Sequence, residues 1–182
     1  MANLIQEQQK TVFNELKKEF EWANVMQVPK IEKVVVSVGI GSTKDKNKIK
    51  LIAERLATIT GQKPATRLTK KAIASYKTRI GDTVGYQVTL RGSRAQNFLN
   101  RLLHIALPRT KDFKGIPVTA IDEMGNYTLG IKEHSVFPET ADEELKDIFG
   151  MAITVVTTAK GKEEAKAYLT HLGFPFKKTA AK

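Results

Sequence analysis

Three histidines and one acidic cluster carry the side chains that could hold a metal ion or transfer a proton. His104, His134 and His171 lie far apart, and none stands at metal-ligand spacing from another histidine or from a suitable carboxylate motif. The acids between Glu139 and Asp147 could attract a cation, but their spacing is typical of a solvated helix face rather than of a calcium loop. The sequence therefore predicts no metal site and no histidine general base.

A glycine pair lies where a dinucleotide-binding turn would be, between a predicted strand and a predicted helix. The GxGxxG fingerprint needs a third glycine at the position of Lys44, and no acidic residue stands where it would hold a ribose. Gly39 and Gly41 therefore predict a tight turn. The chain also has no cysteine and no GxSxG nucleophile elbow. We expect no cofactor and no enzymatic activity.

Positive charge is concentrated in one third of the chain. The net charge is +11, and residues 60–116 hold twelve Lys and Arg against two acids, so this basic segment carries +10. Such a field attracts a polyanion, of which nucleic acid is the commonest in a cell. Aromatic residues make up only 7% of the chain. We therefore expect phosphate and sugar contacts rather than base stacking, which favours structured RNA.

The most informative polar residues lie on the predicted strand 84–91. Strand alternation places its apolar residues on one face and Gln87, Thr89 and Arg91 on the other. Small, hydrogen-bonding and cationic groups on a flat sheet suit the shallow minor groove of RNA. Polar residues on or beside the first two predicted strands extend this surface: Ser37, Gln62 and Lys63.

The elements that must position these residues mix helices and strands at irregular spacing. Helices are predicted at 3–20, 43–60, 93–107 and 163–172, and strands at 31–40, 65–68, 84–91, 126–132 and 151–158. We expect Ser42 or Thr43 to cap the second helix. Gly61 should end that helix, and Pro108 should end the third. Without a regular βαβ rhythm the pattern predicts an α+β fold with a mostly antiparallel sheet.

The sequence also predicts the number of domains and the cellular compartment. The length predicts a single domain at 1–178, followed by a short basic C-terminal tail at 179–182. The longest run without a charge is twelve residues, which is too short to span a membrane. The N-terminus lacks the features of a secretory signal, so we expect a cytoplasmic protein.

Several short segments along the chain form a recognisable series: 26–34 (MQVPKIEKV), 59–64 (ITGQKP), 70–74 (KKAIA), 88–92 (VTLRG), 106–115 (ALPRTKDFKG), 125–133 (GNYTLGIKE), 137–139 (FPE) and 157–160 (TTAK). In this order they resemble the bacterial-type family of large-subunit ribosomal protein five, the universal 5S rRNA-binding ribosomal protein family. Together they extend the resemblance over residues 4–178.

The resemblance implies a structural protein of the ribosome. Proteins of this family bind 5S rRNA in the central protuberance, contact the large-subunit rRNA and the P-site tRNA, and bridge to small-subunit ribosomal protein thirteen. Other large-subunit proteins of the central protuberance are then its neighbours. The implied fold is a sheet with helices packed on one face and an RNA-facing opposite surface. Charge pattern and resemblance together give these candidate rRNA-binding residues: Ser37, Gln62, Lys63, Arg67, Gln87, Thr89, Arg91, Arg109, Lys111 and Lys114.

Three of these positions depart from the family pattern. The family most often has Asn at the position of Ser37, and its Arg-Asp-Phe-Arg-Gly motif has arginine at the positions of Lys111 and Lys114. Serine has a shorter reach than asparagine, and lysine has no planar fork. The individual contacts at these three positions must therefore differ in detail.

The connection between the second and third predicted strands, residues 70–82, is longer than a turn requires. Compact domains rarely keep a connection of this length without a use, and this one is basic up to Asp82. In proteins that resemble this chain, the matching loop touches the elbow of P-site tRNA. The implied tRNA-contacting residues are Ala74, Ser75, Tyr76, Lys77, Thr78 and Arg79.

Two other functions remain open at the level of sequence. An RNA-processing or RNA-modifying enzyme could use a similar basic surface, although no cofactor loop, metal cluster or activated nucleophile supports it. A DNA-packaging protein is a weaker alternative, because the chain has neither a repeat nor a basic arm. The RNA recovered with the protein separates these functions from the ribosomal one.

Overall fold

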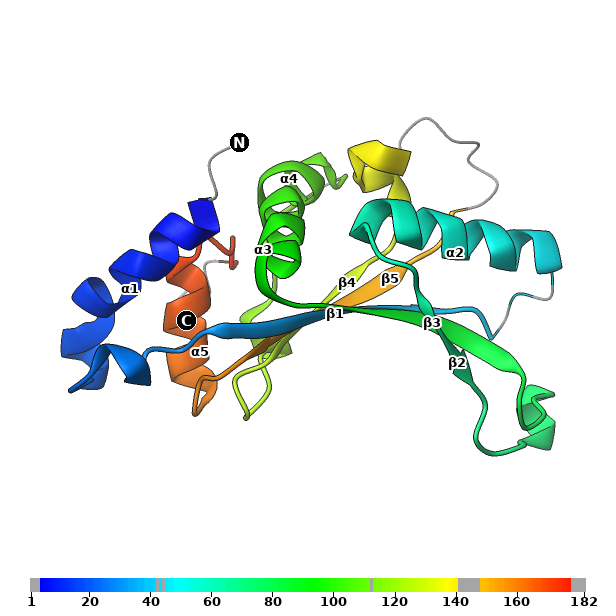
Figure 1. Cartoon of the computed structure of the whole chain (residues 1–182), viewed down its shortest axis with the longest axis horizontal. Coiled ribbons are helices and arrows are strands. Elements are labelled where there is room, and N and C mark those ends of the chain that lie inside the picture. The colour runs from blue at the N-terminus through cyan, green and yellow to red at the C-terminus, as the bar shows by residue number, and fades with distance from the viewer. Residues whose placement is uncertain (1–3, 42, 44, 112, 141–147, 178–182) are drawn as a thin grey trace. The chain divides into compact units, whose positions relative to one another are not determined.

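The computed structural model describes residues 4–41, 43, 45–111, 113–140 and 148–177 (Figure 1). The predicted tail at 179–182 lies outside the described residues. The α-helices are α1 Leu4–Phe20, α2 Lys46–Thr60, α3 Gly92–Arg101, α4 Leu107–Arg109 and α5 Lys162–His171. The strands are β1 Ile31–Gly39, β2 Ala65–Leu68, β3 Thr83–Leu90, β4 Tyr127–Ile131 and β5 Met151–Thr157. The predicted elements are therefore present, with ends within a few residues of those expected.

The strands form one five-stranded sheet in the order β2-β3-β1-β5-β4. The sheet is antiparallel, which confirms the α+β class predicted from the sequence. The buried residues of β1 and β5 alternate with partly exposed ones. This alternation follows from the period of two along a strand, and it gives each strand one core face and one outer face.

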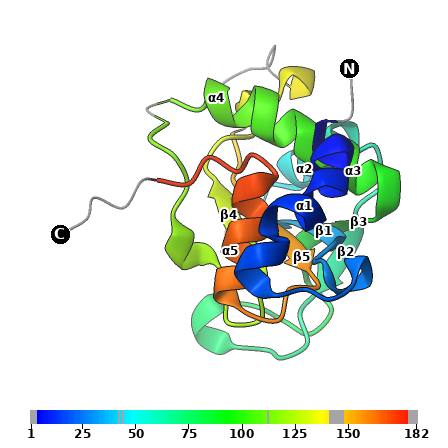
Figure 2. The same ribbon diagram turned by 90° about the vertical axis from the view of Figure 1, so that its left-hand side faces the viewer.

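By its internal contacts the chain divides into two compact units. The first unit comprises residues 1–34, 90–129 and 154–182, and the second comprises 35–89 and 130–153. In the first unit, α1 packs against both α3 and α5, as Figure 2 shows. The core between these helices is closed by side chains with no exposed surface: Ile5, Val12, Phe98, Leu99, Tyr168 and Leu169.

In the second unit, α2 lies along one side of the strands (Figure 1). Its buried residues Ile52, Leu56 and Ile59 recur at helical spacing and form the apolar stripe that faces inward. The helix begins at Asp45, whose side chain accepts a hydrogen bond from the backbone N–H of Asn47 at 2.9 Å. The expected cap at Ser42 or Thr43 is therefore wrong, because the aspartate next to the first turn supplies the acceptor. Ser42 itself lies outside the described residues.

Pro108 does not end the third helix as the sequence suggested. The backbone continues from α3 through a π-helical stretch, Leu102–Ala106, into α4, and Pro108 lies within that last turn. Proline disrupts an α-helix because it lacks an N–H group and its ring crowds the carbonyl four residues earlier. The wider π turn just before it changes the hydrogen-bond register, so the chain stays helical up to Arg109.

Candidate nucleic-acid interface

An arginine and a glutamine form the centre of the candidate surface in the second unit. β2 pairs antiparallel with β3, and Arg67 lies directly opposite Gly85. Opposite residues share one face of a sheet, so Arg67, Gln87 and Thr89 lie on the same side. The Nε of Arg67 donates a hydrogen bond to Oε1 of Gln87. This bond holds the guanidinium beside Gln87 through Nε, and the side chain of Arg67 remains exposed.

The polar face of β3 agrees with the strand alternation predicted from the sequence. Val88 and Leu90 are buried, whereas Gln87 and Thr89 are partly exposed. All four residues of β2 are exposed, because this strand forms an edge of the sheet. The outer face of β3 is therefore open, and it continues onto an accessible edge strand.

Gly85 brings the backbones of β3 and β1 close together beneath Arg67. A Cβ at this position would lie 2.8 Å from the carbonyl oxygen of Val38, which is backbone and cannot move aside cheaply. We expect Gly85→Ala to lower the free energy of unfolding by about 1–3 kcal/mol through overpacking. Denaturant unfolding of the full chain measures this. Gly39→Ala is the matched control, because a Cβ added at position 39 would have nothing within 4 Å. Equal stability of the two variants would contradict the close approach.

The remaining predicted residues of this unit lie at the borders of the face. Ser37 belongs to the outward residues of β1, and its hydroxyl donates to the carbonyl of Ala152 at 3.5 Å, a weak bond that a stronger acceptor can replace. Gln62 and Lys63 follow Gly61, whose positive φ of 67° ends α2. Pro64 alone separates Lys63 from the start of β2, and Lys63 is exposed.

The basic connection between β2 and β3 forms an ordered hairpin extension, which we call the basic loop, residues 69–82. Thr69 and Asp82 close its base with a backbone hydrogen bond of 2.8 Å. Ile73 and Thr78 form an antiparallel bridge nearer its tip. Between them Ala74–Tyr76 makes a single 3-10 turn, which ends at Lys77 with a positive φ of 52°.

Most residues at the tip of the basic loop are exposed. Tyr76 and Ile80 are 74% and 73% exposed, and the cations Lys77 and Arg79 are exposed as well. The ion pairs recorded among the described residues include none of the loop's cations. The loop therefore presents positive charge and a ring that can stack, held by its own backbone bonds.

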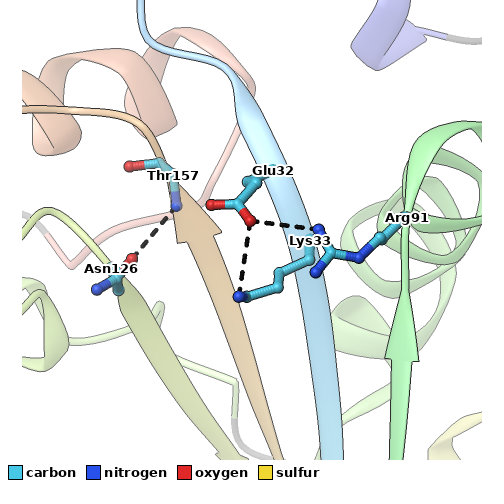
Figure 3. Close-up of polar contacts among 5 residues, drawn as sticks. All are labelled: Glu32, Lys33, Arg91, Asn126 and Thr157. Atoms are coloured by element: carbon cyan, nitrogen blue, oxygen red, sulfur yellow. Dashed lines mark hydrogen bonds and ion pairs between the residues drawn. The ribbon is translucent and has the colours of Figure 1, made fainter.

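In the first unit, Arg91 follows the end of β3 and contacts the start of β1 (Figure 3). Its Nη1 lies 3.2 Å from Oε1 of Glu32, and Nζ of Lys33 lies 3.6 Å from the same oxygen. All three side chains remain partly exposed. Two cations share one carboxylate, so this cluster keeps a net positive charge toward solvent. Sequence reasoning found Arg91 but missed this partner, which lies 59 residues away.

The cluster determines the ionisation of Glu32. The hydrogen bond from Arg91 and, next, the charge of Lys33 hold the pKa of this carboxyl below its ordinary value of 4.5. Because the folded-state pKa is lowered, the ion cluster makes its full contribution to folding stability above pH 4.5. This contribution is lost as the pH falls through the folded-state pKa. We expect Arg91→Ala to raise the pKa of Glu32 toward 4.5, as measured by NMR titration of the side-chain carboxyl. An unchanged titration would show that the contact does not form in solution.

Three further predicted cations lie on a separate stretch of the first unit. Arg109, Lys111 and Lys114 are exposed, and Asp112 lies outside the described residues. This stretch leads into Gly115, which has a φ of 90° and stands against the backbone of residues 175–177. Ile116 exchanges hydrogen bonds of 2.9 Å with the chain at Pro175 and Lys177.

This pairing places an additional cation near the predicted ones. Lys177 is exposed, and its N–H donates to the carbonyl of Ile116, two residues after Lys114. The sequence contained no local signal for this, because the two paired positions lie far apart along the chain. The basic stretch of the first unit is therefore larger than the segment at 109–114.

Two of the three histidines make packing or polar contacts within the fold, and His104 is exposed. His134 is buried and stacks on Phe149 at 4.2 Å between ring centroids. Nδ1 of His171 lies 3.1 Å from Oε2 of Glu15, and this contact connects α5 to α1. No group of three or more His, Cys, Asp or Glu in the described part of the chain could hold a metal ion. The acidic run at 141–147 lies outside that part, as does Lys44. Within it, no helix has both the length and the apolar character to cross a bilayer.

Comparisons with known proteins cover nearly the whole chain. The family model described as ribosomal protein L5 matches residues 24–79, and the model for the C-terminus of the same ribosomal family matches residues 83–176. The large ribosomal subunit protein uL5 of Anaeromyxobacter sp. (strain Fw109-5) is 48% identical over 97% of this chain and 98% of its own length. The protein of the same name from Ureaplasma urealyticum is 49% identical over 92% of this chain and 91% of its own length. That from Natranaerobius thermophilus is 48% identical over 97% of this chain and 99% of its own length.

Proposed function

This chain belongs to the ribosomal protein L5 family and is a structural constituent of the large ribosomal subunit, and from that premise we propose that it binds 5S rRNA and attaches it in the central protuberance. As a member of the family it is an RNA-binding protein of translation, it acts in the cytoplasmic ribosome, and it is not an enzyme. Family membership therefore sets aside the RNA-processing enzyme and the DNA-packaging protein.

The observation that supports 5S rRNA binding is the open polar face of the second unit. Arg67 and Gln87 present a fixed guanidinium and an amide on a flat surface, and Thr89 and Ser37 add hydroxyl groups. Guanidinium and hydroxyl groups are suited to phosphate oxygens and 2′-hydroxyls. Gln62 and Lys63 extend the contact at the border. We assign the 5S rRNA contact to this face.

The cations of the first unit form a second proposed RNA contact. Arg91, with its partner Glu32, and the stretch that carries Arg109, Lys111 and Lys114 are exposed. Exposed lysines bind phosphates as point charges, without the planar fork of arginine. We assign these cations to backbone contacts with 5S and large-subunit rRNA. We also propose that residues 1–178 form a single RNA-binding domain.

The basic loop provides a third proposed contact. Tyr76, Lys77 and Arg79 stand at its exposed tip, and the same tip contains Ala74, Ser75 and Thr78. We propose that this tip touches P-site tRNA. We further propose that the protein bridges to small-subunit ribosomal protein thirteen and contacts its neighbours in the central protuberance.

The RNA that copurifies with the protein tests the proposed function. Captured from a gentle lysate, the full chain should retain 5S rRNA in stoichiometric amount. The variant Arg67→Ala should lose most of it, whereas Lys10→Ala, which removes an exposed cation on α1, should retain it. A mixed RNA population, equal for both variants, would contradict a dedicated 5S rRNA site.

Arg91 should contribute measurably to RNA binding. We expect Arg91→Ala to weaken 5S rRNA binding by roughly 1–3 kcal/mol, because a charge-assisted contact is lost. Arg91→Lys keeps the charge and should recover part of that loss. Filter binding with free 5S rRNA measures the affinities of the wild type, Arg91→Ala and Arg91→Lys. An unchanged affinity in a correctly folded Arg91→Ala protein would remove this residue from the interface.

A further inference from the structure

Asp82 is an acidic residue in a segment that otherwise has none. From position 55 to position 81 the chain contains no Asp or Glu, and Asp82 follows at the base of the basic loop. A carboxylate close to a surface that binds phosphate repels its ligand. The presence of Asp82 there therefore requires a structural role that compensates for this repulsion.

The hydrogen bonds of Asp82 connect it to both sides of the loop. Its Oδ2 accepts the backbone N–H of Arg79 at 2.8 Å, and its own N–H donates to the carbonyl of Arg79 at 3.2 Å. Its carbonyl accepts both the backbone N–H of Thr69 at 2.8 Å and the hydroxyl of Thr69 at 3.1 Å. One residue thus closes the turn at 79–82 and joins it to the opposite side of the loop.

The carboxylate acts on the backbone and not as a counterion. The ion pairs recorded for the described residues do not include Asp82, and the bond to Arg79 is made to its main chain. Gly81, with a φ of 92°, permits the sharp turn between them. The side chain of Arg79 therefore remains exposed while its backbone is held.

We propose that Asp82 is a positioning residue, which braces the basic loop so that Lys77 and Arg79 meet P-site tRNA in a preformed arrangement. The inference rests on the proposed tRNA contact of the loop. Ordering an unbraced loop at the moment of binding costs conformational entropy, which a loop fixed beforehand avoids. The charge of Asp82 opposes binding, and its acceptor oxygen favours it.

These two effects have opposite signs, so substitutions separate them. Asp82→Ala removes a negative charge, which by electrostatics alone strengthens tRNA binding, and it also removes the acceptor for the Arg79 N–H. Asp82→Asn removes the same charge but keeps an acceptor oxygen. Asp122→Ala is the matched control, because Asp122 also accepts a backbone N–H, that of Asn126 at 2.6 Å, outside the loop.

The full-length variants are assembled into reconstituted ribosomes, and retention of P-site tRNA is measured. We expect Asp82→Ala to weaken retention on the order of tenfold, the loss of one hydrogen bond to a charged group. Asp82→Asn and Asp122→Ala should retain tRNA at least as well as the wild type. Binding of free 5S rRNA should be unchanged in all three, and the Arg79 amide should exchange faster only in Asp82→Ala.

Several outcomes would overturn the proposal. Retention in Asp82→Ala equal to or above the wild type would show that the brace has no function, and an equal loss in Asp82→Asn would show that the charge itself is required. The double variant Lys77→Ala/Arg79→Ala tests the tRNA contact separately. If it keeps tRNA, the proposed contact is wrong, and the amide exchange of Arg79 alone then decides whether Asp82 braces the loop.

Discussion

Replacing residues 73–79 by a short Gly-Ser link should leave 5S rRNA binding nearly intact and weaken the retention of P-site tRNA. The replaced segment contains Tyr76, Lys77 and Arg79, all exposed. The hydrogen bonds between Thr69 and Asp82 lie outside it and should still close the base of the loop. Because at least two cations and a stacking ring are lost together, we expect retention to fall by about 100-fold.

Both affinities are measured on the same variant, with free 5S rRNA and with reconstituted ribosomes. The charge-matched control is Lys160→Ala/Lys162→Ala, which removes two exposed cations outside the basic segment and should affect neither affinity. A collapse of 5S rRNA binding while tRNA stays bound would place the loop in the 5S rRNA site. The division of contacts between the sheet face and the loop would then be wrong.

Binding of 5S rRNA should depend steeply on salt. If about six to eight phosphates are engaged, the logarithm of affinity should fall against the logarithm of salt concentration with a slope of about −4 to −7. Between about 50 and 200 mM salt, the affinity then falls by roughly 10²- to 10⁴-fold. The physical reason is that the basic segment, which carries +10 of the net charge of +11, releases counterions condensed on the RNA when it neutralises the phosphates.

A salt titration of variants tests which cations produce this salt dependence. Lys63→Ala/Arg67→Ala should reduce the magnitude of the slope by about 1.4 to 1.8, since each lost phosphate contact contributes about 0.7 to 0.9. The control Lys160→Ala/Lys162→Ala should keep the slope of the wild type. A wild-type slope shallower than about −2 would mean that the basic segment is not the binding surface.

Local patterns in the sequence predicted much of the fold. The outer residues Gln87 and Thr89 were identified because alternation along a strand depends only on neighbours two positions apart. Gly61 was identified as the end of α2 for a similar reason, since its positive φ is a property of one residue. The predicted cap at Ser42 or Thr43 and the predicted helix end at Pro108 failed where two local signals competed, the nearer cap Asp45 in one case and a π turn in the other.

By itself, the sequence determined the α+β class, the basic segment and the segments that carry the family resemblance. Only the tertiary structure decided which distant residues meet. Arg67 reaches Gln87 because β2 folds back on β3, and Arg91 reaches Glu32 because β1 lies beside β3 in the sheet. Composition and periodicity describe single segments, whereas strand order and hairpin closure depend on pairings between segments. For that reason Asp82 appears in the sequence as an acid among cations, and its bonds to Arg79 and Thr69 appear only in the folded chain.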